Sequence, residues 1–224
     1  MTKIINLETA TTNCSVSISV DGKLVSVKEE NTPNYSHSEQ LHIFIKEALE
    51  EASFSFADID AIAVSKGPGS YTGLRIGVSA AKGLCFSLDL PLISIPTLES
   101  MSHQIKVEPN EVIIPVLDAR RMEVYSCVFN HSHHKIRETK AEVIDENSFE
   151  EFSGYKKVHF LGSGAEKIET LLDHPNFKFH KEVIPSSKEM AKLSQKKFEV
   201  NDFEDVAYFE PYYLKDFILQ TKKA

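Results

Sequence analysis

Two acidic residues that end apolar segments are the first candidates for chemistry in this chain. Glu8 ends the segment that begins at Lys3, and Asp118 ends the segment that begins at Val112. Carboxylates at the ends of equivalent strands, facing each other across a cleft, can hold a magnesium ion beside phosphates. They can also cap the turns that follow, with Glu8 accepting hydrogen bonds from the amides after it. Glu8, Thr9 and Asp118 are therefore candidate cofactor-binding residues, and both interpretations remain open.

A glycine-rich segment, Gly67 to Gly73, precedes a helical pattern and is a candidate phosphate loop. Helix N-termini attract anions, and glycine lets a ligand approach the backbone, which adds Gly69 to the candidates. The segment matches neither the Gly-x-x-x-x-Gly-Lys-Ser/Thr nor the Gly-x-Gly-x-x-Gly spacing. A tight turn from strand to helix explains the same residues.

Other reactive residue types lack the spacing that their chemistry needs. His37 and His42 are five residues apart, about 140° around a helix, so they are poorly placed to bind one ion. The histidines of 131–134 lie in an apparent turn of polar residues, and no His-Glu-x-x-His or Gly-x-Ser-x-Gly motif occurs. The three cysteines, Cys14, Cys85 and Cys127, are odd in number and far apart, which favours reduced, packed thiols. No metal site and no nucleophilic centre is predicted.

Length and charge restrict the classes of protein further. The 224 residues suit one large domain or two compact halves, and 42% of them are hydrophobic. The net charge of −8 argues against a chain that holds nucleic acid through its overall field. No apolar run approaches the roughly 20 residues that span a bilayer, and the N-terminal segment is too short and polar for a signal peptide. A cytoplasmic protein with no membrane contact is expected.

The first hundred residues predict an α/β unit. Alternating apolar residues and an Asp21-Gly22 turn indicate a three-stranded meander. Ser36 and Glu39 have the spacing of a capping box, which predicts the start of a helix. The expected strands are 3–7, 14–20, 23–30, 59–64 and 92–95, and the expected helices are 37–52 and 72–88.

The second half repeats this order at an offset of about 95 to 110 residues, which indicates a duplicated α/β unit. Strands are predicted at 112–118, 123–129, 136–144 and 158–161, with a short helix near Ser148 and another after the Gly162 loop. A further helix, 188–198, and a tail around 213–219 follow. The predicted domains are residues 1–100 and 101–224, with the C-terminal tail able to pack back on the first lobe.

Small residues recur every four positions along the second helix, at Gly73, Gly77, Ala81 and Cys85. Each interior glycine costs about 1 kcal/mol of helix propensity, so the stripe implies close packing against something. Its own sheet and another chain are both candidates. The apolar surface of the two long helices exceeds what one sheet face needs, which favours an interface between chains.

Several motifs together resemble the TsaB (YeaZ) family of bacterial tRNA threonylcarbamoyladenosine biosynthesis proteins. They are Glu8-Thr9-Ala10-Thr11-Thr12, the Gly-Pro-Gly-Ser-Tyr-Thr-Gly-Leu-Arg-Ile-Gly run of 67–77, Asp118-Ala119-Arg120 leading to Glu123-Val124-Tyr125, and Tyr213-Leu214-Lys215-Asp216. The resemblance covers nearly the whole chain and is weakest between residues 130 and 197.

This resemblance implies an actin-like ATPase (ribonuclease H-like) fold, α/β, with duplicated βββαβα units forming two lobes. It also implies a complex with the catalytic paralogue TsaD and with TsaE, which modifies the adenosine 3′ of the anticodon in tRNAs that read codons beginning with A. The two long helices would bind TsaD, or a second copy in a homodimer, and tRNA would be reached only through the complex. The implied interface residues are Leu41, Ile45, Leu49, Gly73, Leu74, Gly77, Val78 and Ala81.

The chain departs from the family pattern at two reactive positions. Where the catalytic paralogue has His-x-x-x-His, the segment from Pro96 keeps only His103. Where actin-like ATPases have Asp-x-Gly, this chain has Glu8-Thr9-Ala10. The departures imply a non-catalytic scaffold subunit with no cofactor of its own, and with ATP or ADP only at a subunit junction. The alternatives are an enzyme acting alone, either an ATPase or a glycoprotease-like metallopeptidase, and a freestanding homodimeric regulator.

Overall fold

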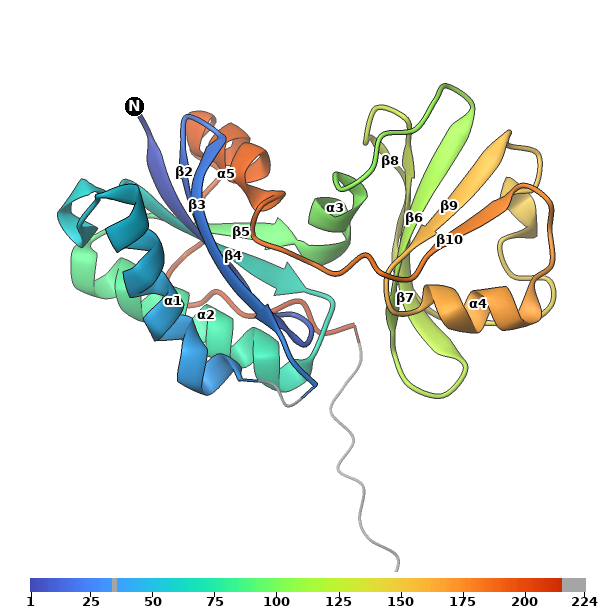
Figure 1. Ribbon diagram of the computed structural model, residues 1–224, viewed down its shortest axis with the longest axis horizontal. Helices are drawn as coiled ribbons and strands as arrows, with labels where there is room; N and C mark the ends of the chain where they lie inside the picture. The colour runs from blue at the N-terminus through green and yellow to red at the C-terminus, as the bar shows by residue number, and fades with distance from the viewer. Residues whose placement is uncertain (34–35, 215–224) are drawn as a thin grey trace, which may run out of the picture.

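The chain folds into two lobes, each built on a five-stranded mixed sheet (Figure 1). The computed structural model describes residues 1–33 and 36–214. The first sheet holds β1 (Lys3–Glu8), β2 (Asn13–Val20), β3 (Lys23–Asn31), β4 (Ala61–Gly67) and β5 (Leu92–Pro96). The second holds β6 (Glu111–Asp118), β7 (Glu123–Asn130), β8 (Lys135–Val143), β9 (Lys157–Leu161) and β10 (Phe177–His180). The helices are α1 (His37–Ala52), α2 (Tyr71–Leu88), α3 (Thr97–Ser102), α4 (Ala165–Leu171) and α5 (Met190–Glu199), with 3₁₀ turns η1 (Phe56–Asp58) and η2 (Glu150–Phe152).

The two sheets have the same strand order, which confirms the predicted duplication. The first runs β3-β2-β1-β4-β5 and the second β8-β7-β6-β9-β10. In each sheet the first three strands form an antiparallel meander, and the last two run parallel to the first. The equivalence extends to β10, a four-residue strand that the sequence pattern does not reveal.

Several local predictions differ from the structure. Ser36 does not cap α1 with its side chain, because its hydroxyl donates to Glu30 Oε2 at 3.3 Å instead. The helix expected near Ser148 is the single 3₁₀ turn η2, and α3 was not predicted. Of the tail expected around 213–219, residues 215–219 lie outside the described part of the chain.

The first sheet is covered on both faces. Ile5 and Leu7 of β1 pack beneath α1 and α2, whereas Ile4 lies on the opposite face with Met190 and Leu193 of α5. Helix α5 therefore completes the first lobe, although it is separated from that lobe in sequence by the whole second sheet (Figure 1). The domain boundary predicted after residue 100 falls inside α3, and the region predicted as a second domain returns to the first one.

The serines of β2 form a buried polar seam. Ser15 Oγ lies 2.8 Å from Ser187 Oγ, and Ser17 Oγ donates to the Ser187 carbonyl at 2.9 Å. The loop before α5 thus binds the face of β2 that strict alternation would otherwise leave to water. These bonds fix the position of α5 on the first sheet.

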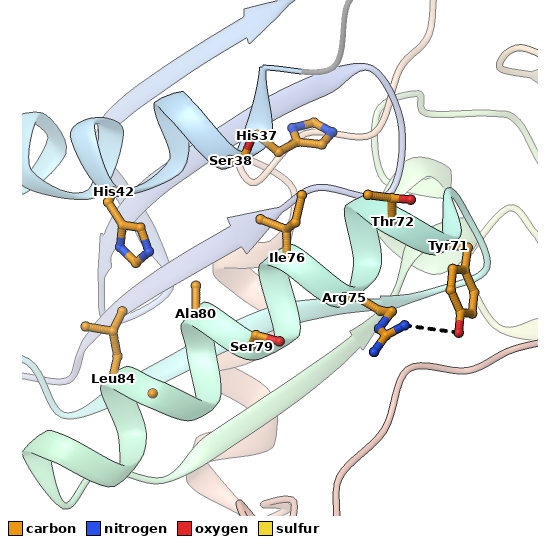
Figure 2. Close-up of a pocket in the computed structure, with 11 residues that line it drawn as sticks. His37, Ser38, His42, Tyr71, Thr72, Arg75, Ile76, Ser79, Ala80 and Leu84 are labelled. Atoms are coloured by element: carbon orange, nitrogen blue, oxygen red, sulfur yellow. Dashed lines mark hydrogen bonds between the residues drawn. The ribbon is translucent and has the colours of Figure 1, made fainter.

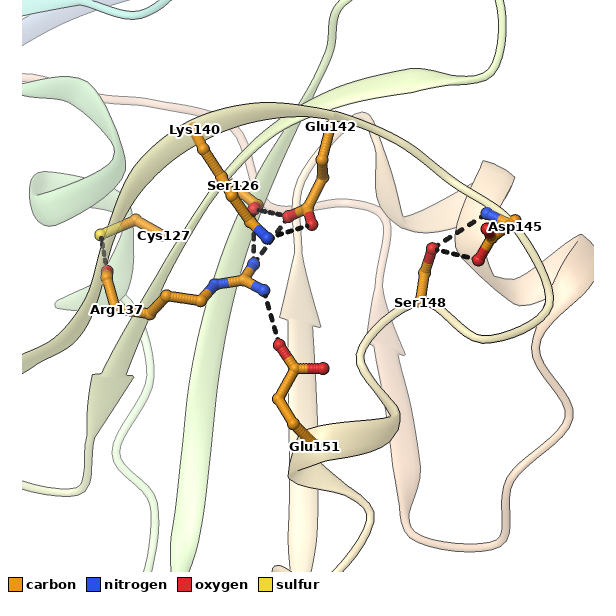
Figure 3. Close-up of polar contacts among 8 residues, drawn as sticks. All are labelled: Ser126, Cys127, Arg137, Lys140, Glu142, Asp145, Ser148 and Glu151. Carbon is orange, nitrogen blue, oxygen red and sulfur yellow. Dashed lines mark hydrogen bonds and ion pairs between the residues drawn. The ribbon is translucent and has the colours of Figure 1, made fainter.

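The outer edge of the second sheet is held by Arg137 of β8 (Figure 3). Its guanidinium donates to Glu142 at 2.7 Å, to Ser126 at 2.8 Å and to Glu151 at 3.0 Å. Arg137 is 17% exposed and lies over the rings of Phe149 and Phe152. A largely buried cation is thereby paired on two sides, which joins β8 to the η2 turn.

Arg137→Ala should lower the free energy of unfolding by about 2 kcal/mol, because it removes the cation that Glu142 and Glu151 share and leaves Glu142 with Lys140 and Ser126 alone. Urea denaturation measures the change. Lys135→Ala is the control: Lys135 pairs with the exposed Glu138, and such a surface pair contributes about 0.5 kcal/mol or less. Equal losses for the two variants would contradict this account of the β8 edge.

Among residues 1–33 and 36–214, no helix has both the length and the apolar composition that a membrane crossing requires.

Candidate partner interface

The eight residues predicted to form the partner interface are buried inside their own chain. Leu41 and Ala81 are 0% exposed, and Ile45, Leu74 and Val78 are at most 4% exposed. Leu49, Gly73 and Gly77 are also buried. As a set of partner-contacting side chains the prediction is wrong, since most of these side chains form the core between the helices and the first sheet.

The small-residue stripe of α2 serves packing within the lobe. A Cβ atom at Gly73 or Gly77 would overlap Thr9, and one at Gly69 would overlap Ala10. The helix approaches the turn between β1 and β2 so closely that the Thr9 hydroxyl donates to the Gly73 carbonyl at 2.8 Å. Of the two candidates for the stripe's partner, the structure selects the chain's own β1–β2 turn.

The solvent-facing sides of α1 and α2 form a groove of about 710 Å³ (Figure 2). Ile76, Ala80 and Leu84 follow one another along α2 and face α1, from which His42 points toward them (Figure 2). Gly83 lies in the groove wall, and a Cβ atom there would meet nothing within 4 Å. The remaining lining residues are His37, Ser38, Tyr71, Thr72, Arg75 and Ser79.

Exposed apolar side chains extend this surface. Phe86, three residues beyond Gly83, is 87% exposed, and Ile43 of α1 is 49% exposed. Residues three and four apart share a helix face, so Ser79, Gly83 and Phe86 form one stripe. An exposed phenylalanine beside an open groove is typical of a surface that binds another protein. Sequence reasoning missed this stripe, although the apolar Phe86 on a polar helix face was an available signal.

An aromatic and cationic cluster closes one end of the groove. The Arg75 guanidinium lies 5.4 Å from the centroid of the Tyr71 ring and donates to the Tyr71 hydroxyl at 3.3 Å. The Tyr71 ring lies 4.9 Å from that of Tyr213, so the C-terminal segment borders the groove. Burial, and then the neighbouring Tyr71, raise the pKa of Tyr213.

The candidate phosphate loop of residues 67–73 packs against the turn between β1 and β2. Gly69 packs under Ala10, and the amide of Ser70, at the start of α2, donates to the Ala10 carbonyl at 2.6 Å. Thr9 is buried by its bond to α2. The Ser70 amide and the Thr9 hydroxyl are therefore used by hydrogen bonds within the chain.

Glu8 is fully buried and faces inward. Its Oε1 accepts from the Ala10 amide at 2.6 Å and from the Ser65 hydroxyl at 2.8 Å, while Oε2 has no partner. Burial raises the pKa of Glu8 to about 7, against the lowering effect of these hydrogen bonds. Glu8 therefore accepts hydrogen bonds from the turn that follows it, as the turn interpretation expects.

Asp118 is engaged within the second lobe. Its carboxylate accepts from Lys167 at 2.6 Å and from the Arg120 amide at 2.6 Å. The structure therefore commits Glu8 and Asp118 to separate hydrogen-bond sets, one in each lobe. In the part of the chain described, no group of three or more His, Cys, Asp or Glu residues is arranged to hold a metal ion.

The cysteines are buried and unbridged, as predicted. Burial raises the pKa of Cys14 and of Cys85 to about 12, so neither thiol is an activated nucleophile.

Comparison with known proteins supports the resemblance seen in the motifs. The family model "TsaD: tRNA N6-adenosine threonylcarbamoyltransferase" matches residues 32–224. The tRNA threonylcarbamoyladenosine biosynthesis protein TsaB of Escherichia coli (strain K12) is 27% identical over 230 residues, which cover 98% of this chain and 97% of that protein. The TsaB of Bacillus subtilis (strain 168) is 36% identical over 98 residues, 44% of this chain and 42% of that one. The solved structure of YeaZ from Pseudomonas aeruginosa aligns with a TM-score of 0.79 at 22% identity, covering 96% of this chain and all of that one.

The strand order and the structural match define an α/β protein of two lobes with the fold of YeaZ. The chain belongs to the TsaD family and, within it, to the TsaB (YeaZ) group of tRNA threonylcarbamoyladenosine biosynthesis proteins. The fold and the family named from the sequence motifs are both confirmed.

Proposed function

We propose that this chain is a non-catalytic scaffold subunit that binds TsaD through the groove between α1 and α2. The complex that they form with TsaE transfers a threonylcarbamoyl group to the adenosine 3′ of the anticodon in tRNAs reading codons that begin with A. The observation that carries the proposal is the open apolar groove, with Phe86 exposed beside it, on a lobe whose phosphate-loop backbone is used internally. The acidic chain meets tRNA only through its partners, in the cytoplasm.

The relationship between this chain and TsaD supports an interface of pseudo-twofold symmetry. A chain that the TsaD family model matches over residues 32–224 shares with TsaD the segment that carries α1 and α2. Two related proteins with the same helix pair can dock these pairs face to face, as in an isologous dimer. The same geometry lets two copies of this chain pair when TsaD is absent.

An enzyme acting alone has no support from the site. Thr9 is buried against α2, Gly69 packs against Ala10, and the Glu8 carboxyl is buried in the protein. Of the candidate acids, Asp118 is committed to Lys167. The scaffold role therefore remains the proposal, and any ATP or ADP would lie at a subunit junction.

Phe86→Glu combined with Gly83→Arg should abolish co-purification with TsaD and lower threonylcarbamoyladenosine in tRNA to the level of cells depleted of this protein. The two changes place charge and bulk in the groove, and neither position supports the core. Pull-down with TsaD and mass spectrometry of tRNA nucleosides, in depleted cells that express each variant, measure the two effects.

Val143→Glu is the matched control, because Val143 is 69% exposed on β8 of the second lobe. It should bind TsaD and restore the modification like the wild-type chain. Circular dichroism verifies that both variants fold. Undiminished TsaD binding by the folded double variant would exclude the groove as the interface. An unchanged level of threonylcarbamoyladenosine in tRNA after depletion of this protein would contradict its assignment to the pathway.

A further inference from the structure

A second pocket, of about 230 Å³, lies where the two lobes meet. It is bounded by the end of β5, by α3, by the turn between β7 and β8, and by α5. These elements come from both sheets, and Figure 1 shows α3 between the two lobes. The lining residues are Ile95, Pro96, Glu99, His103, Ser132, His133, His134, Leu193, Lys196 and Lys197.

The pocket collects basic side chains. Three histidines and two lysines line it, against the single carboxylate of Glu99. Lys197 is neutralised by Asp202 at 2.9 Å, whereas no residue of 1–33 or 36–214 pairs with Lys196. The positive charge of Lys196 acts on both His103 and His133. Lys196 is thus an unpaired cation beside two imidazoles, and the Glu99 carboxylate lines the same pocket.

The rings of His103 and His133 are stacked, with centroids 4.1 Å apart and planes inclined by 20°. His133 takes a left-handed backbone conformation, φ 57°, which is uncommon for a residue other than glycine. Burial, then His133, Lys196 and Lys192, lower the pKa of His103 to about 4. Burial and Lys196 also lower the pKa of His133. These shifts favour neutral rings, each with one N–H donor, and the Nδ1 of His133 lies 3.5 Å from Ser102 Oγ.

Parallel rings cannot share a metal ion. An imidazole binds a metal in the plane of its ring, at about 2 Å from the nitrogen. Two parallel planes 4.1 Å apart do not converge on such a point. Side-by-side N–H donors can instead reach two different oxygens of one tetrahedral oxyanion, and a lysine supplies the countercharge.

We propose that this pocket binds a phosphate, either inorganic phosphate or the phosphate group of a small monoester, between Lys196 and the imidazoles of His103 and His133. Its volume accepts a phosphate with water, whereas the organic part of a monoester has to remain outside. The ligand contacts α5 and the end of α3 on one side and the β7–β8 turn on the other, so it braces one lobe against the other. The inference does not depend on the groove between α1 and α2.

Histidine NMR tests the proposal directly on the full chain. Sodium phosphate is titrated at constant pH and ionic strength, with chloride as the replaced anion. We expect saturable shifts of the His103 and His133 ring signals and a rise in both pKa values, because a bound anion favours the protonated ring. AMP should produce the same shifts in competition with phosphate.

Lys196→Met removes the charge, keeps the aliphatic side chain, and should weaken phosphate binding at least tenfold. Lys178→Met, at an exposed lysine of β10, is the control and should bind like the wild-type chain. Absence of saturable shifts, or equal affinity in Lys196→Met, would overturn the proposal. Shifts with AMP but none with phosphate would overturn it as well, because the contacts would then be to the base or the ribose.

Discussion

Gly77→Ala should destabilise the isolated chain by about 3 kcal/mol, at the upper end of what overpacking in a core costs. The added methyl group would overlap the Thr9 side chain, which is fully buried between β1 and α2. The helix and the turn must then separate, and the bond from the Thr9 hydroxyl to Gly73 is strained or lost. The bulkier Gly77→Leu should prevent folding altogether, so it cannot report on partner binding.

Gly83→Ala, on the same helix, should instead raise the free energy of unfolding. Its Cβ atom meets nothing within 4 Å, so the substitution only removes the conformational entropy cost of glycine in a helix. The expected gain is about 0.5 to 1 kcal/mol. Urea denaturation of the two alanine variants measures both effects at one pH. A lower free energy of unfolding for Gly83→Ala, or an unchanged one for Gly77→Ala, would contradict the packing described for α2.

The burial of Glu8 predicts a stability that falls as pH rises. The unfolded chain ionises this carboxyl near pH 4.5, whereas the folded chain holds its proton up to about pH 7. Below pH 4.5 both states are protonated and Glu8 has no effect. Between pH 4.5 and 7 only the unfolded state releases the proton, so the free energy of unfolding falls by about 3 kcal/mol. Above pH 7 both states are ionised, and the contribution of Glu8 stays at this lower value.

Glu8→Gln should remove this dependence. An amide does not ionise, and its oxygen can still accept from the Ala10 amide and the Ser65 hydroxyl. The variant should therefore gain stability over the wild-type chain as the pH of the urea titration is raised from 4.5 to 8. Glu146→Gln, at an exposed loop position, is the control and should give a constant difference. A constant difference for Glu8→Gln would show that the carboxyl is ionised in the folded chain.

The duplication could be read from the sequence because its signals are local. Each half contains the same succession of apolar strand, acidic residue, hairpin and glycine loop, and each of these features follows from neighbouring residues. The short elements gave weaker signals. A strand such as β10 has only four residues and owes its existence to parallel pairing with β9, and α3 has only six.

The interface was harder to predict because periodicity identifies a stripe but not what covers it. Gly73 and Gly77 could face another chain or their own, and only the position of the β1–β2 turn decides between these. The partner-facing candidates lie on the opposite side of α2, where Gly83 and Phe86 interrupt a polar face. The polar face of β2 was similarly ambiguous, because its serines bind Ser187, more than 160 residues later.

The return of α5 to the first sheet has a consequence for how the protein is made. Residues 1–102 leave the ribosome before residues 190–199, so one face of their sheet stays uncovered until the later segment has been synthesised. N-terminal domains usually fold during translation, before the rest of the chain appears. Here the first lobe has to wait, with its apolar strands exposed, for residues 190–199 to emerge, so a chaperone can bind it during that interval.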